Sequence, residues 1–242
     1  TGLEGHSLGN LFITALAEIT GSFEEAVIES GRVLAVTGRV LPSTLQDVRL
    51  VAEIAVPGQD KLLQVKGESF ITKAGGEVRR VWLEPTNPLA YPPTIQAILS
   101  ADLIIIGPGS LYTSLLPDLL VPDLVDAVRA SKALRFFVCN VASQPGETQG
   151  YTCGDHVHTI ERHINGPLFD LVICNDNFSA KLPGGTEWIK PEDESQRDYI
   201  LYQADLMSAE TPWRHDSQKL AHTIMDLYEE RTGPLTERED VA

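Results

Sequence analysis

Three apolar runs separated by helix-like segments constrain the fold of this 242-residue chain more than any other feature. The runs are "DLIII" at 102–106, "LRFFVCNV" at 134–141 and "FDLVIC" at 169–174. Apolar residues at helical spacing predict helices at 92–100, 122–132 and 154–164. Continuous apolar strands that alternate with helices are typical of a parallel sheet covered on both faces. We therefore expect an α/β fold in which ligands bind outside the carboxyl ends of the strands.

The rest of the chain adds elements around this pattern. Residues 47–84 alternate apolar and polar side chains between glycine-containing turns, which predicts an antiparallel meander that includes "GESFITK" at 67–73. Further expected elements are helices at 7–19 and 22–30, a strand "VLAVTG" at 33–38, and a C-terminal extension at 176–242 with a short strand and a final helix. We expect a single nucleotide-binding-like domain over residues 1–242.

The charge and cysteine content exclude some classes of function. The formal net charge of -15 opposes binding to nucleic acid or to an anionic membrane surface, although a small phosphorylated ligand needs only local donors. No apolar run approaches the roughly 20 residues of a membrane span. Cys139 and Cys174 lie in apolar runs and are expected to be small buried side chains, and no metal-ligand spacing links the three cysteines. This pattern suits a reducing cytoplasm.

The turn "GPGSLYTS" at 107–114 follows the first apolar strand. Gly107 and Gly109 can adopt backbone angles closed to other residues, and Ser110, Thr113 and Ser114 add hydroxyl groups. Together with the amides of a following helix they would form a phosphate-binding nest. The alternative is a tight turn with serine and threonine caps. The turn is neither a Walker loop nor a Gly-x-Gly-x-x-Gly fingerprint.

A second candidate site lies near the start of the chain, in "EGHSLGN". It combines small and polar residues at a helix start, where a histidine could bind phosphate or act as a general acid. The alternative is a helix cap with an exposed histidine. The candidate residues are Gly5, His6, Ser7, Gly9 and Asn10.

The loop at 140–152 is the third candidate. Asn140, Gln144 and Glu147 bring hydrogen-bonding groups to a strand's carboxyl end, which suits recognition of a base or a sugar. The alternative is a long surface loop. Asp155, at the start of the next helix, is expected to be a charge at a helix N-terminus rather than part of a metal pair with the nearby histidines.

"PWRHD", just before the final helix, is the fourth candidate. Arg214 could clamp a phosphate or a diphosphate through two hydrogen bonds. Asp216 could contribute to the site or serve as the N-cap of the helix. We find no Ser-His-Asp arrangement with a nucleophile elbow and no carboxylate pair with an acid/base division, so no residue is predicted to be catalytic.

These segments, taken in order, resemble a known family. "GHSLGNL", "RVLP", "ADLIIIGPGSLYTSLLPDLLV", "NVASQPGETQGYTCGDHV" and "RHD" are similar to the gluconeogenesis factors of the YvcK/CofD-like family, which is related to 2-phospho-L-lactate transferase. The resemblance implies a Rossmann-like three-layer α/β sandwich, a cytoplasmic location and a possible homodimer. For the gluconeogenesis-factor branch it implies a uridine-diphosphate-sugar ligand and a regulatory role in carbon metabolism, cell shape and cell-wall precursor supply.

By the same resemblance, residues 107–114, including Pro108 and Tyr112, contact phosphate, the segment at 5–10 forms the adjoining pocket wall, and Arg214 clamps the ligand. The transferase branch has Asn-Pro where this chain has Leu111-Tyr112, which favours the gluconeogenesis-factor branch. Family members also begin with a strand, a glycine run and an Asp-rich segment that are not found here. We therefore expect a nucleotide-sugar-binding regulator without turnover. The alternative is a phospho-group transferase using Mg²⁺ in the full-length protein.

Overall fold

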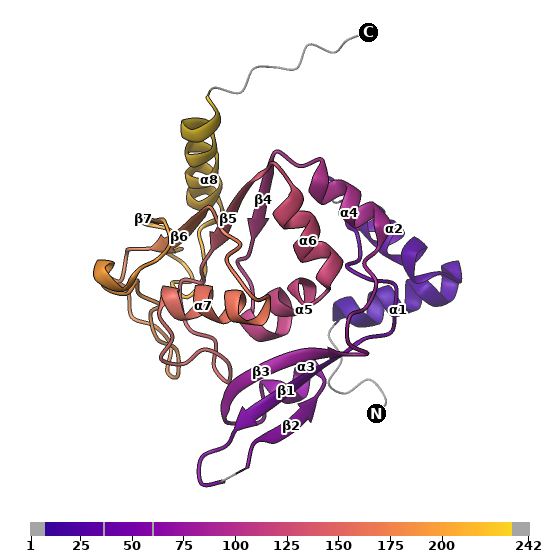
Figure 1. Ribbon diagram of the computed structural model, residues 1–242, viewed down its shortest axis with the longest axis horizontal. Helices are drawn as coiled ribbons and strands as arrows, with labels where there is room; N and C mark the ends of the chain where they lie inside the picture. Colours follow the sequence, from indigo (N-terminus) through magenta and orange to yellow (C-terminus); the bar gives the residue numbers. More distant parts are fainter. Residues whose placement is uncertain (1–7, 36, 60, 234–242) are drawn as a thin grey trace. The chain divides into compact units, whose positions relative to one another are not determined.

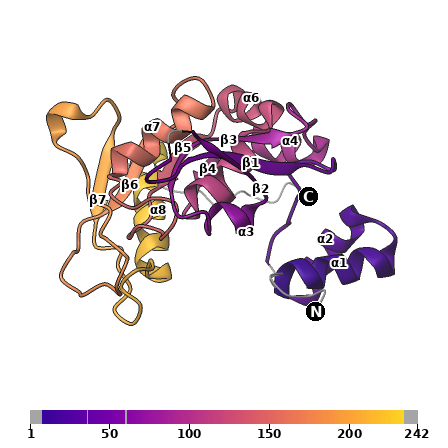
Figure 2. The same ribbon diagram turned by 90° about the horizontal axis from the view of Figure 1, so that it is seen from below.

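The computed structural model describes residues 8–35, 37–59 and 61–233, and the chain divides into two compact units. The first unit runs as far as Ala101 and includes Tyr112–Ser131, and the second comprises Asp102–Leu111 and the chain from Lys132 onward. Figures 1 and 2 label the elements, from α1 in indigo to α8 in yellow. A single domain over residues 1–242 stays a prediction.

A four-stranded parallel sheet forms the centre of the second unit, as the apolar runs predict. Its strands lie in the order β4-β5-β6-β7, so neighbours in the sheet are also successive along the chain. In register, Ile106 pairs with Phe137, Phe136 with Leu171, and Cys174 with Gln203. The bounds are Leu103–Ile106, Leu134–Val138, Leu171–Asn175 and Leu201–Ala204.

Helices cover both faces of this sheet. Alternate strand residues point to opposite faces, and because the strands are apolar throughout, both faces must be buried. Phe136 and Ile173 pack on one face with Ile224 and Leu227 of α8 (Ser217–Thr232). On the other face, the ring of Phe137 stacks on Phe169 at 4.9 Å between centroids. Helix α7 (Cys153–His163) lies on the opposite side of β5 and β6 from α8 (Figure 2). The second unit therefore has the expected three-layer α/β arrangement.

The helices of these layers begin at side-chain caps. Thr152 and Asp155 form a capping box at the start of α7, in which each side chain accepts a hydrogen bond from the other residue's backbone amide. Asp216 accepts hydrogen bonds from the amides of Gln218 and Lys219 at 3.0 and 3.1 Å. The helix-terminal role predicted for Asp155 is confirmed, and of the two roles left open for Asp216 the structure shows the N-cap.

Replacing Asp216 with alanine is expected to lower the free energy of unfolding by about 1 kcal/mol, because two amides of the first turn of α8 lose their acceptor. Urea unfolding followed by circular dichroism measures the change. Asp226→Ala, an exposed carboxylate in the same helix, is the matched control and should change stability by no more than about 0.5 kcal/mol. Equal effects of the two substitutions would contradict the capping role.

The first unit contains the predicted antiparallel meander. Strand β1 (Arg49–Ala55) lies between β2 (Leu63–Lys66) and β3 (Glu77–Glu84), with a register shift between Glu53 and Ile54. Its helices are α1 (Leu8–Thr20), α2 (Phe23–Val33), α3 (Glu68–Ile71), α4 (Pro92–Leu99), α5 (Leu116–Leu119) and α6 (Pro122–Ala130). A π-helical segment, Leu111–Leu115, precedes α5, and a 3₁₀ turn, Glu194–Gln196, belongs to the second unit.

Two predicted strands are wrong. At 33–38, helix α2 continues past Gly31 to Val33 and ends where Ala35 adopts the left-handed φ of 50°. At 67–73, Gly67 has a φ of 98°, which turns the chain out of β2 and into α3. In both places local backbone conformation overrides the apolar pattern.

Candidate functional site

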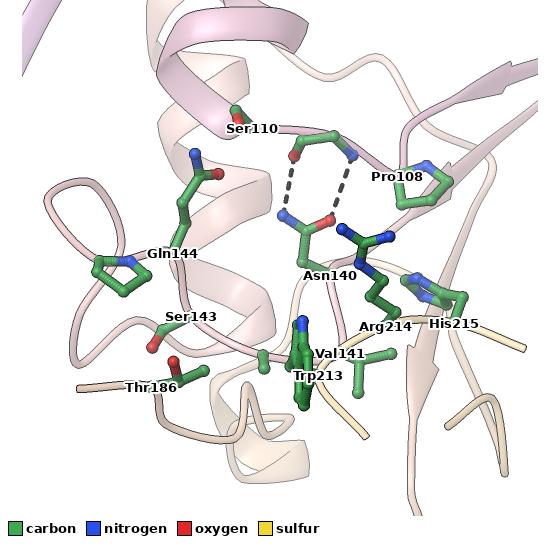
Figure 3. A pocket seen from close by; sticks show the side chains of 13 residues that line it. Pro108, Ser110, Asn140, Val141, Ser143, Gln144, Thr186, Trp213, Arg214 and His215 are labelled. Atoms are coloured by element: carbon green, nitrogen blue, oxygen red, sulfur yellow. Dashed lines mark hydrogen bonds between the residues drawn. The ribbon is translucent and has the colours of Figure 1, made fainter. Parts of the chain in front are cut away.

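A cavity of about 660 Å³ opens in the second unit, where the chain leaves β4 and β5 (Figure 3). Such a volume falls in the range of small-molecule sites. Four segments contribute to its wall: the turn after β4, the loop after β5, the chain between β6 and β7 through Thr186, and the segment just before α8. The lining residues are Pro108, Gly109, Ser110, Asn140, Val141, Ala142, Ser143, Gln144, Pro145, Thr186, Trp213, Arg214 and His215. The cavity lies at the carboxyl ends of parallel strands, where the fold class favours a ligand.

Asn140 fixes the glycine turn at the edge of this cavity. Its Nδ2 donates to the carbonyl of Gly109 at 2.8 Å, and its Oδ1 accepts from the Gly109 amide at 3.2 Å (Figure 3). The preceding Gly107 has a φ of 84°, a value that favours glycine. The Gly109 amide therefore points to Asn140. In a phosphate nest built here, the Asn140 side chain would be the part that holds the turn in shape.

We expect Asn140→Asp to loosen the turn. The aspartate keeps an acceptor for the Gly109 amide but loses the donor, and it places a negative charge against the Gly109 carbonyl. The expected loss of stability is about 1–3 kcal/mol, measured by urea unfolding at pH 7.

Gln149→Glu is the matched control for this change. Its Oε1 accepts from the Gly146 amide at 3.0 Å on an exposed part of the same loop, and glutamate retains that acceptor. The control should be nearly neutral in stability. If Asn140→Asp were equally neutral, the two hydrogen bonds to Gly109 would not hold the turn.

The loop at 140–152 is held by hydrogen bonds rather than left as a free surface loop. Ser143 exchanges two hydrogen bonds with the backbone of Glu187: its amide donates at 2.7 Å and its hydroxyl accepts at 2.9 Å. Ala142 forms an isolated antiparallel bridge with Trp188. Gln144 donates from Nε2 to Oε1 of the buried Glu147 at 3.1 Å. Glu147 therefore positions Gln144 and is not itself a lining residue.

Arg214 is the cationic group of the cavity wall. Two backbone hydrogen bonds fix its main chain. Its amide donates to the Thr211 carbonyl at 2.8 Å, and its carbonyl accepts from the Ser208 amide at 3.0 Å. The side chain is exposed, and no ion pair within the described part of the chain involves it. No aspartate or glutamate is among the described residues that line the cavity. An anion would therefore meet Arg214 without a competing carboxylate.

His215, the next residue, is held neutral. Burial lowers its pKa, while a hydrogen bond from its ring to the backbone of Cys139 acts in the opposite direction. Trp213, on the other side of Arg214 in the sequence, is 44 % exposed and lines the cavity. An exposed aromatic ring beside an arginine can stack on a base or a sugar.

The structure brings together six of the predicted site residues. Pro108, Gly109, Ser110, Asn140, Gln144 and Arg214 line the cavity. Gly107 precedes the lining segment. Tyr112, Thr113 and Ser114 belong to the first unit; Tyr112 is fully buried, and its hydroxyl donates to the Val78 carbonyl at 3.2 Å. Tyr112 is therefore a core residue rather than a ligand contact.

The candidates near the start of the chain are mostly outside the described residues. Gly5, His6 and Ser7 lie there, and so does the side chain of Asn10. Gly9 is an exposed residue in the first turn of α1. The pocket-wall role of this segment stays a prediction.

Sequence reasoning missed Trp213, Thr186 and Ser143. Trp213 precedes Arg214 in "PWRHD". An aromatic residue next to the predicted phosphate-binding arginine could have identified it as a further site residue. Thr186 lies in a segment without periodicity, and only its place in the folded chain brings it to the cavity.

Over 8–35, 37–59 and 61–233, no three or more histidine, cysteine, aspartate or glutamate side chains are grouped so that they could hold a metal ion. None of the helices in these ranges combines the length and the apolar character that a bilayer crossing requires.

The chain is similar in sequence to a described protein family and to gluconeogenesis factors of other bacteria. The family described as 2-phospho-L-lactate transferase CofD matches residues 1–231. The gluconeogenesis factor of Bacillus subtilis is 40% identical over 245 residues, which cover 94% of this chain and 73% of that protein. A relative from Nostoc sp. is 45% identical over 238 residues, which cover 94% of this chain. This chain spans about half (51%) of the Nostoc protein.

Solved structures give the same result. A crystal structure of a Bacillus halodurans protein superposes with a TM-score of 0.80 at 35% sequence identity, covering 93% of this chain and 73% of that one. A second crystal structure, of a UPF0052 family member from Bacillus halodurans, gives 0.79 at 33% identity, covering 93% of this chain and 74% of that one.

Proposed function

The chain belongs to the CofD family, with gluconeogenesis factors among its relatives, and on that basis we propose that it is a regulatory protein that binds a nucleotide sugar of the uridine-diphosphate type. The ligand occupies the cavity after β4 and β5. Its diphosphate lies against Arg214, and its base or sugar uses the neutral groups of the loop at 140–145. Arg214 and Trp213 supply charge pairing and stacking.

One observation carries this proposal: the cavity wall combines an unpaired arginine with neutral hydrogen-bonding side chains, and its described residues include no carboxylate. A diphosphate needs cationic or amide donors, which this wall provides. Phosphoryl transfer usually also needs carboxylates that hold Mg²⁺. The wall therefore fits binding better than turnover.

The proposed regulator acts in the cytoplasm, in carbon metabolism, cell shape and cell-wall precursor supply, and a homodimer is its proposed assembly. Nucleic acid and membrane surfaces are not proposed as partners, because the net charge of -15 repels both.

Isothermal titration of uridine-diphosphate N-acetylglucosamine into the full-length protein tests the ligand class. We expect saturable heat at tens of micromolar protein, competition by uridine diphosphate, and no response to uridine alone. Absence of heat, with a validated uridine-diphosphate-sugar-binding protein as positive control, would overturn the proposal.

The second candidate function is a phospho-group transferase, favoured by the description of the matching family. It would use Mg²⁺ with carboxylates from outside the cavity wall described above. Incubating the full-length protein with Mg²⁺, a guanosine-diphosphate-activated phospholactate and a deazaflavin acceptor tests this function. Product formation would favour the transferase over the regulator.

A further inference from the structure

A second cavity, of about 600 Å³, opens in the first unit and shares no lining residue with the cavity of the second unit. Its volume is in the range of small-molecule sites. The second half of α2, the segment at 38–41 and the start of α4 contribute to its wall. The proposed nucleotide-sugar site does not use this cavity, so a ligand bound here is a separate one.

A short sequence repeat brings two arginines to this wall. Gly-Arg-Val-Leu occurs at 31–34 and again at 38–41. The first copy lies at the end of α2, and the second begins at Gly38, whose φ of 108° favours glycine. The glycine and the arginine of both copies line the cavity. The repeat therefore places two positive charges beside one space.

Hydrogen bonds hold the walls of this cavity together. The amide of Tyr91 donates to the Ser43 carbonyl at 3.0 Å. The Thr94 hydroxyl donates to the Pro42 carbonyl at 2.7 Å, so two bonds join the start of α4 to the chain that follows the second copy of the repeat. The Tyr91 hydroxyl donates to Glu24, which joins the same point to α2. The cavity is therefore built into the first unit.

Gly31 keeps part of the cavity open. It lies in the last turn of α2, and its φ is outside the left-handed region. A Cβ atom at this position would have no atom from another part of the chain within 4 Å, so close packing does not require glycine either. Glycine is less favourable than alanine inside a helix. The consequence of glycine here is the empty space that it leaves in the cavity wall.

Apolar side chains and an unpaired cation meet in this cavity. Ile28 and Val40 line it and are 45% and 47% exposed, so a ligand here covers apolar surface that water otherwise contacts. Arg32 pairs with Glu29 at 2.5 Å, whereas the side chain of Arg39 has no ion pair or hydrogen bond with another described residue. No carboxylate is among the described residues that line this cavity. The cavity therefore offers one unpaired positive charge beside an apolar wall.

We propose that this cavity binds a small carboxylic acid with an apolar body. Its carboxylate pairs with Arg39, because a planar guanidinium donates two parallel hydrogen bonds to a carboxylate. Its apolar body lies on Ile28, Val40 and Tyr91 and fills the space beside Gly31. A single unpaired arginine favours one negative charge, so a carboxylate suits this site better than a phosphate dianion. The proposal does not rest on the binding of a nucleotide sugar.

Sodium octanoate is the probe, and it is titrated into the full-length protein by calorimetry at two temperatures. Burial of apolar surface changes the heat capacity, so the heat of binding cannot vanish at both temperatures. We expect saturation at one site per chain, with a dissociation constant of about 1 mM or tighter. Octanol lacks the charge and acetate lacks the apolar body, so each should bind more weakly than octanoate by about 10-fold or more.

Octyl phosphate tests the choice of the anion and should also bind more weakly than octanoate. Three results would overturn the proposal: no saturable heat with octanoate, octanol or acetate binding as tightly as octanoate, or octyl phosphate binding more tightly.

Two arginine variants test the charged contact. Arg39→Ala should lower the affinity for octanoate by about 10-fold or more, because it removes the charged partner. Arg49→Ala removes an equal charge from an exposed position of β1 in the same unit and should leave the affinity unchanged. Equal effects of these two substitutions would refute the pairing of the carboxylate with Arg39.

Gly31→Phe and Gly31→Ala test the space itself. Phenylalanine would occupy the cavity and should abolish binding, whereas alanine should retain binding and raise the melting temperature, as expected inside a helix. Circular dichroism shows whether Gly31→Phe stays folded; if it does not, the comparison of Arg39→Ala with Arg49→Ala still decides. Wild-type affinity in a folded Gly31→Phe variant would place octanoate outside this cavity and refute the proposal.

Discussion

Phe136→Ala is expected to lower the free energy of unfolding of the second unit by about 3–5 kcal/mol, the usual cost of removing a buried aromatic side chain. Phe136 is fully buried in the centre of β5, between the neighbouring strands and α8. Its loss leaves a cavity lined by Val138, Ile173 and Leu227, which cannot close without moving the sheet or α8. This cost is a large fraction of the stability of an ordinary domain.

Amide hydrogen exchange measures this effect locally, because a two-unit chain need not unfold in one step. The amides of β5, β6 and α8 should lose protection together, while those of β1 and β3 in the first unit keep theirs. Ile200→Ala is the control, since Ile200 is 64% exposed in the same unit and its truncation should be nearly neutral. Loss of protection confined to residues next to position 136 would mean that α8 and the sheet are not one cooperative core.

The parallel sheet was predictable because its signal is local. Each strand is a short continuous apolar run, and each intervening helix repeats its apolar residues at helical spacing, so the order of elements follows from sequence alone. The caps at Asp155 and Asp216 were predictable for the same reason, since a cap depends on residues three positions apart at most. The sequence also predicts the short strand β7, but not that it pairs with β6.

The wrong elements show where local signals conflict. Residues 33–38 are as apolar as a strand, yet Val33 and Leu34 are 64% and 65% exposed, and α2 continues across Gly31. At Gly67 a single positive φ decides between a strand and a helix, and the sequence does not state which glycine adopts it. Tyr112 illustrates a third case, because a residue inside a conspicuous motif can serve the core.

The site was half predictable. Strand ends in a parallel sheet meet at one edge, so the turn after β4 and the loop after β5 could be placed together in advance. Two features depend on the fold. The Asn140–Gly109 hydrogen bonds join residues 31 positions apart, and Trp213 reaches the wall from the segment before α8. No spacing rule in the sequence connects these pairs.

The proposed function depends most strongly on Arg214. Its exposed guanidinium lies in a cavity wall whose described residues include no carboxylate. The guanidinium can therefore bind an anion without first breaking an ion pair. The overall charge of -15 would otherwise repel an anionic ligand, which makes a local cation necessary for affinity.

Arg214→Ala is therefore expected to weaken binding of uridine-diphosphate N-acetylglucosamine by roughly 10- to 150-fold, the range that corresponds to losing about 1.5–3 kcal/mol of hydrogen bonding to a charged group. Arg214→Lys keeps the charge but not the two-pronged geometry, so its affinity should fall between those of the wild type and the alanine variant. Arg162→Ala removes an equal charge from an exposed position of α7 and serves as the control for the change in net charge. Titration calorimetry on the three variants at two salt concentrations separates direct contact from long-range attraction, because only the latter weakens strongly with salt. If Arg162→Ala and Arg214→Ala lost affinity equally, Arg214 would contribute only general charge, and the diphosphate would have to lie elsewhere in the cavity.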